Sequence, residues 1–196
     1  MAQINMGLDL LADNNLIFKR KFRWQLSLSW KNENNKIPPY YVKLAARPSL
    51  TIEETPINYL NGRMYIPGKA EWETLSVTFY DVAYNTNGPK ILYSWLASVY
   101  DFTDPKTLRQ NSKSKVYGGN GTLTLFDGCG EALEEWQLFN VWPTSVNFGD
   151  LDYASSDEVT IEATLRFSSV KYTSLCPSYT LEKDCDGCRH FSVPKQ

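Results

Sequence analysis

Several stretches of the chain alternate between apolar and polar residues, which is the pattern of β-strands that bury one face. Residues 22–30 alternate in this way from Phe22 to Trp30, and residues 74–80 and 158–167 repeat the pattern. Each stretch predicts a half-buried strand whose apolar members, Phe22 included, point inward. Shorter strands are predicted at 41–46, 49–55, 122–126 and 136–142, the last of them ended by Pro143.

One stretch shows helical spacing instead. Apolar residues recur every three or four positions from Ile91 to Val99, and Pro89 suits the first turn of a helix. We therefore predict an amphipathic helix at 89–100. The glycine-rich run 118–121 is expected to be a flexible turn, because its spacing fits no phosphate-binding motif and no helix is expected after it.

These elements define a mainly β fold. Seven or eight predicted strands and one helix indicate an antiparallel β-sandwich or barrel with one flanking α-helix. The length of 196 residues suits one domain, which we place at 1–172. Within it, residues 1–20 are expected to form an N-terminal arm, and a cysteine-containing C-terminal tail follows at 173–196.

Residues 55–70 predict a projecting hairpin loop. Asn61 and Gly62 are a favoured pair for a two-residue hairpin turn, because both residues tolerate positive φ. The predicted strands at 22–30, 74–80 and 158–167 already supply a core, so apolar side chains around the turn need another partner. Those side chains are Tyr59, Leu60, Met64, Tyr65 and Ile66.

Composition and charge narrow the function. Hydrophobic residues make up 42% and charged residues 21%, which excludes global disorder, and no apolar run is long enough to predict membrane insertion. The N-terminus has no basic start or cleavage pattern of a secretory signal. The net charge of −2 hides an asymmetry, because residues 116–165 contain nine acids and no Lys or Arg. One interpretation is that these acids are ordinary solvated side chains. The other is that they give the fold a surface that repels polyanions or meets a basic surface of a neighbour.

Candidate chemistry is sparse, and we predict no enzyme and no cofactor. The only histidine is in the tail, which excludes histidine-based catalysis in the body, and carboxylates such as Glu134 and Glu135 form no placed catalytic pair. Three thiols and one imidazole could hold zinc, form a disulfide or stay reduced, and the spacing leaves these alternatives open. The zinc candidates are Cys176, Cys185, Cys188 and His190.

Several segments, taken in order, resemble the tail-tube proteins of contractile-tailed bacteriophages. The run Tyr59 to Lys69 (YLNGRMYIPGK) followed by Trp72 to Asp81 (WETLSVTFYD) is similar to the family's central hairpin and strand. Trp142 to Val146 (WPTSV) then leads through an acidic loop into the strand at 158–167, as in the family's C-terminal part. The predicted helix at 89–100 also stands where the family has its one helix.

The resemblance implies a structural subunit. Hexameric rings would stack into a hollow tail tube, surrounded by a sheath protein and started on baseplate or initiator proteins. Viral genomic DNA would pass through the lumen into the host cell without specific binding. The subunit would be made in the host cytoplasm and end in the virion. Type VI secretion, pyocins and extracellular injection systems use related tubes, so such a system is an alternative to a phage.

Two sets of site residues follow from this resemblance. The five apolar residues around the hairpin turn would contact an adjacent ring. Strand alternation places Glu158, Glu162 and Thr164 opposite the apolar residues Val159 to Phe167, as candidates for the lumen or a ring contact. A different class of function, a carbohydrate-binding β-sandwich module with exposed Trp and Tyr side chains, remains an alternative.

Overall fold

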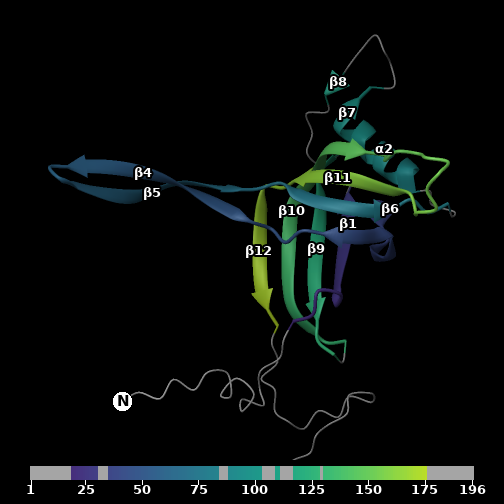
Figure 1. Ribbon diagram of the computed structural model, residues 1–196, viewed down its shortest axis with the longest axis horizontal. Coiled ribbons are helices and arrows are strands. Elements are labelled where there is room, and N and C mark those ends of the chain that lie inside the picture. The colour runs from purple at the N-terminus through teal and green to yellow at the C-terminus, as the bar shows by residue number, and fades with distance from the viewer. Residues whose placement is uncertain are drawn as a thin grey trace, which may run out of the picture.

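The described part of the chain folds into two crossed β-layers and one long hairpin (Figure 1). The structure is a computed structural model, and it describes residues 19–30, 35–83, 88–102, 109–110, 117–128 and 130–175. The first layer has the order β2-β1-β9-β10-β12, with all neighbours antiparallel. Its strands are β1 (Trp24–Trp30), β2 (Asn35–Ile37), β9 (Gly119–Phe126), β10 (Ala132–Asn147) and β12 (Ser169–Ser174).

The second layer has the order β10-β11-β6-β3 and is also antiparallel. A short 3-10 helix, η1, precedes β3. The edge strands β2, β3 and β12 do not pair with one another in the described part of the chain, so the sheet is an open sandwich and not a closed barrel. The elements introduced here are η1 (Pro39–Tyr41), β3 (Val42–Ala45), β6 (Leu75–Tyr80) and β11 (Thr160–Arg166).

Strand β10 belongs to both layers and sets their crossing. Its residues up to Val141 pair with β9, whereas Trp142 onward pairs with β11. The pairing is irregular beside Asn140, whose φ is 53°, and again after Pro143. Irregularities of this kind let a strand bend from one sheet into another. The expectation that Pro143 ends the strand was therefore wrong, because a proline is tolerated beside a bulge.

The apolar faces predicted by alternation form the core between the layers. Leu26, Leu28, Ile161 and Leu165 are buried, together with the apolar members of β6 and β9. The exception is Phe22, which precedes β1 and remains 75% exposed, so its predicted inward position was wrong. The mainly β, antiparallel fold class is confirmed.

The helix α2 (Gly88–Val99) confirms the segment predicted at 89–100. It packs on the sandwich through buried Leu92 and Trp95. The indole of Trp95 stacks on that of Trp30, with centroids 5.0 Å apart, and its Nε1 donates a 2.8 Å hydrogen bond to the carbonyl oxygen of Tyr117. No helix among the described residues is long and apolar enough to cross a bilayer.

The glycine-rich run is part of a strand and not the flexible turn that we expected. Gly119 and Gly121 lie in β9, paired with both β1 and β10. A Cβ on Gly119 would come within 2.3 Å of the Ser29 carbonyl oxygen, a distance too short for any side chain. Glycine is used here because the neighbouring backbone approaches closely.

Strands β4 (Leu50–Tyr59) and β5 (Gly62–Trp72) form the hairpin, which projects far from the sandwich (Figure 1). The predicted short strand at 49–55 corresponds to the first part of β4, at the root of the hairpin. The two turn residues are Leu60 and Asn61, one position earlier than predicted, and Leu60 takes the positive φ of 48°. Beside α2, the two short strands β7 (Tyr100–Asp101) and β8 (Arg109–Gln110) pair with each other.

Candidate assembly surfaces

The hairpin carries apolar side chains that the described residues of its own chain leave in solvent. Every residue of β4 and β5 is exposed except Trp72, which is half-buried at the root. At the tip, Leu60 is 89% exposed and Met64 is 66% exposed. None of the five predicted contact residues belongs to the core. A contiguous exposed set of this size is typical of an interaction surface.

Strand pairing divides these side chains between two faces of the hairpin. Tyr59 pairs with Gly62 and Ile57 pairs with Met64, so these residues share one face. On the opposite face, Tyr65 pairs with Pro56, next to Arg63 and Asn58, which are joined by a 3.0 Å hydrogen bond. The first face is apolar and the second mixed. We define the apolar face as Ile57, Tyr59, Met64 and Ile66.

The root of the hairpin is fixed to the sandwich. The Arg166 guanidinium on β11 forms an ion pair with Glu71 on β5. The Trp72 ring lies 5.9 Å from that of Phe167, and the Glu73 backbone N–H donates a 3.0 Å hydrogen bond to the Ser49 carbonyl oxygen. These contacts fix the direction in which the hairpin leaves the sandwich.

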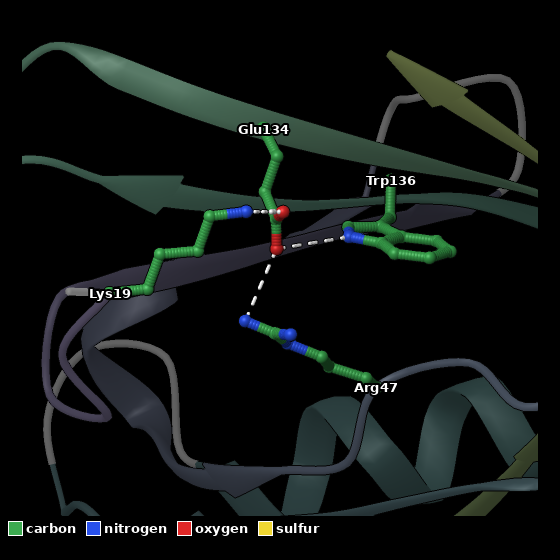
Figure 2. A network of polar contacts seen from close by, with 4 residues as sticks. All are labelled: Lys19, Arg47, Glu134 and Trp136. Carbon is green, nitrogen blue, oxygen red and sulfur yellow. Dashed lines mark hydrogen bonds and ion pairs between the residues drawn. The ribbon is translucent and has the colours of Figure 1, made fainter. Parts of the chain in front are cut away.

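A buried carboxylate ties two further segments to this region (Figure 2). Glu134 on β10 is only 3% exposed. One carboxylate oxygen accepts a hydrogen bond from Nζ of Lys19, where the described chain begins. The other lies 3.2 Å from a guanidinium nitrogen of Arg47, in the link before the hairpin, and 3.5 Å from Nε1 of Trp136. Glu134 thus joins the N-terminal segment and the hairpin link to β10.

Burial of the carboxyl alone would raise the pKa of Glu134, because burial penalises the charged form. The hydrogen bonds from Lys19 and Trp136, together with the positive charges of Lys19 and Arg47, act in the opposite direction and outweigh burial. The pKa of Glu134 therefore lies below its ordinary value of 4.5. At neutral pH the group is a carboxylate that holds both cations.

The side chains on the solvent face of the first layer are mostly of one chemical type, neutral and polar. Cross-strand rows run from β1 through β9 and β10 to β12, and hydroxyl and amide side chains fill most of their positions. The two charged members, Glu135 and Lys171, have opposite signs. The rows are Gln25-Thr124-Glu135-Thr173, Ser27-Thr122-Gln137-Lys171 and Ser29-Asn120-Phe139-Ser169.

The three residues predicted to face the lumen or a ring contact lie on the second layer or beside it. They are Glu158, Glu162 and Thr164. Glu162 is exposed and Thr164 half-buried, and both lie on the solvent face of β11, opposite the buried Ile161, Ala163 and Leu165. Glu158 precedes this strand, and its carboxylate lies 3.9 Å from Nζ of Lys43. These positions agree with the alternation, and a lumen or ring contact stays a prediction.

The candidate zinc residues Cys176, Cys185, Cys188 and His190 lie outside the described residues, as does the N-terminal arm up to residue 18. Within the described ranges, no three His, Cys, Asp or Glu side chains gather as a metal site requires.

Comparison with known proteins gives structural matches only. No protein-family model and no curated protein matches the sequence. A chain from the PVC extracellular contractile injection system, in its sheath–tube complex in the extended state, superposes with a TM-score of 0.59. It is 20% identical, with 85% of this chain and 97% of that one covered.

Two further solved chains match in the same way. One, from the sheath/tube terminator of the PVC system, gives a TM-score of 0.63 at 18% identity, covering 82% of this chain and 99% of that one. The other, from the tube-terminating cap of the anti-feeding prophage, gives 0.62 at 17% identity, covering 83% and 97%. This chain therefore shares the fold of these chains from the PVC extracellular contractile injection system and the anti-feeding prophage.

The sequence offered no signal for the junction at Glu134. The carboxylate is one of two adjacent acids in an acid-rich stretch, and its partners lie 115 and 87 positions away at Lys19 and Arg47. Only the three-dimensional arrangement shows that Glu134 is buried and paired.

Proposed function

We propose that this chain is a structural tube subunit of a contractile particle, forming hexameric rings that stack into a hollow tail tube. The observation that carries the proposal is the apolar face of the hairpin, which is exposed in a chain whose tail-tube fold already has a complete core. A second copy in the neighbouring ring buries this face. Sheath and baseplate or initiator proteins are the further partners.

The conduit wall is the uniform hydroxyl and amide face of the first layer. Few charges on this face and no basic cluster leave little to retain a polyanion such as DNA. Glu162 and Thr164, on the other layer, form a second polar surface toward the lumen or a neighbouring ring. Passage of viral genomic DNA, synthesis in the host cytoplasm and a place in the virion follow from the resemblance to phage tubes.

Two alternatives are separated by particular features. A related injection system differs only in cargo and particle, and electron microscopy of particles from the producing cells distinguishes it from a phage. A carbohydrate-binding module needs aromatic rings on one platform, but Tyr59 and Tyr65 lie on opposite faces of the hairpin. Nor do we assign the chain an enzymatic reaction.

The test is assembly of the purified chain, with and without an initiator complex, followed by negative-stain microscopy. We expect rings or tubes of uniform width from the unchanged protein. Met64→Asp and Tyr65→Asp should shorten or abolish tubes while leaving the melting temperature of the unassembled subunit within about 2 °C, because neither side chain is in the core. Lys69→Asp, on the same strand, is the matched control and should assemble normally.

Two results would contradict the proposal. The first is a chain that stays monomeric at every concentration and salt, even with the initiator. The second is a Met64→Asp variant that melts several degrees lower yet builds normal tubes, because the hairpin would then serve the core of its own subunit.

A further inference from the structure

A groove with an apolar floor opens between the start of the described chain, β1, β9 and β3. Its volume is about 680 Å³. The floor consists of Trp24, Leu123 and Leu125, and the exposed side chains of Phe22 and Leu44 stand at its sides. Both side chains remain exposed in the described part of the chain.

The rim of the groove is basic. Its lining contains no acidic residue, and the buried Glu134 neutralises only part of the positive charge through Lys19 and Arg47. The ion pairs of Glu134 do not include Arg20 or Lys21, whose positive charges lie along one side of the groove. The basic residues of the lining are Lys19, Arg20, Lys21, Lys43 and Arg47.

The loop at 148–159 has the complementary character. It carries four acids and no base. Leu151 is 85% exposed, and Tyr153, two residues later, is fully exposed. Hydrogen bonds within the loop, such as Ala154 N–H to the Asp152 carboxylate at 2.9 Å, give it local shape. The acids are Asp150, Asp152, Asp157 and Glu158.

The loop of the same chain does not fill the groove. Glu158 at the base of the loop lies 3.9 Å from Lys43 at one end of the groove, and both side chains are exposed. Nevertheless Leu151 and Tyr153 remain in solvent, as do Phe22 and Leu44. Two complementary surfaces that the described residues of one chain leave uncovered are suited to meeting between chains.

We infer that the loop 148–159 of one copy docks into the groove of a second copy. Leu151 and Tyr153 cover the apolar floor, Asp150 faces Lys21, and Asp157 faces Arg20. The groove and the loop are different surfaces, so the contact is head-to-tail and each copy donates to one neighbour and accepts from another. The inference rests on the proposed function, because it supplies a contact between neighbouring subunits of the tube.

Charge reversal tests the pairing. Lys21→Glu and Asp150→Lys should each raise the concentration needed for assembly about five- to tenfold at an ionic strength of about 0.1 M, because attraction becomes repulsion. The double variant should recover most of this loss. Lys90→Glu, the same substitution on α2 outside the groove, is the matched control and should assemble as the unchanged chain does. A double variant that is as weak as the singles overturns the inference.

Cross-linking identifies the contact directly. Benzoylphenylalanine in place of Tyr153, in an equal mixture of ¹⁵N-labelled and unlabelled chains, is irradiated after assembly. We expect mixed light–heavy peptides that join position 153 to 20–24 or 43–47. Cross-links within one chain only, or mixed links to other surfaces, overturn the docking.

The outcomes separate this inference from the proposed function. If the unchanged chain forms tubes and every charge variant assembles equally, only the docking is wrong. If position 153 links to the groove of a second copy but the only species are closed dimers, loop and groove do pair between copies, whereas the head-to-tail arrangement and the tube proposal are both wrong.

Discussion

The sandwich and the hairpin are built from the same antiparallel pairing, yet they treat apolar side chains in opposite ways. In the sandwich, alternate residues such as Leu26 and Ile161 are removed from solvent by the facing layer. In the hairpin, Ile57 and Met64 alternate just as regularly, but no part of the chain that the structure describes faces them. Two strands alone cannot bury a face, so the hairpin needs a partner that the sandwich does not.

The difference has an energetic meaning. Full burial of a large apolar side chain contributes roughly 1.5–3 kcal/mol. The four side chains of the apolar face can therefore supply several kcal/mol to each contact between copies, before the entropic cost of association is subtracted. The folded subunit gains little from them, since they are exposed in it.

The largest effect on the free energy of unfolding is expected when a large side chain is removed from the sandwich core. Trp95→Ala removes the stack on Trp30 and the hydrogen bond to Tyr117, and it leaves a large cavity. We expect a loss of about 3–5 kcal/mol in the free energy of unfolding, measured by denaturant titration of the unassembled chain. A loss below about 1 kcal/mol would show that α2 is not part of the core that we describe.

An intermediate effect is expected at the junction between the two regions. Glu134→Gln removes the charge that holds Lys19 and Arg47 and should cost about 1–3 kcal/mol at pH 7. Because the folded-state pKa of Glu134 is lowered, its contribution is complete above 4.5 and is lost as the pH falls through the lowered value.

The measurement is the difference in unfolding free energy between the two proteins at several pH values. It should shrink as the pH falls below 4.5 and through the lowered pKa of Glu134. A difference that stays constant down to pH 2 would contradict the charge-based account of the junction.

The smallest effect on the isolated subunit is expected in the hairpin. Ile57→Ala should change the unfolding free energy by no more than about 0.5 kcal/mol, because the side chain is already exposed. Ala163→Gly on β11, which deletes less carbon from a buried position, is a comparison that should cost more. If the order is reversed, the hairpin is stabilised by its own chain and the contrast between the regions fails.

Sequence patterns predicted the sandwich better than its connections. Strict alternation at 74–80 and 158–167 found β6 and β11, and helical spacing found α2. Alternation failed at Phe22, because a period-two pattern does not show where pairing begins. The prediction that Pro143 ends its strand also failed, because bulges in β10 arise from pairing with strands distant in the sequence.

The candidate surfaces were predictable only in part. Asn61 and Gly62 indicated the hairpin, but the division of Tyr65 from Met64 needed the pairing register. The acid-only stretch suggested a basic counterpart, yet the groove is assembled from three separate parts of the chain and has no linear signature. Strand β12 was not predicted, because Val170 and Tyr172 are its only apolar residues and two positions are too few to establish an alternation.

Amide hydrogen exchange of the unassembled subunit and of assembled tubes tests the central claim most directly. We expect peptides covering 55–66 to exchange quickly in the subunit and to become protected in the tube. Peptides covering β1 and β11 should stay protected in both states, because their burial does not depend on assembly. Hairpin peptides that exchange equally fast in subunit and tube would contradict the account, because its apolar face would then have no partner in the assembly.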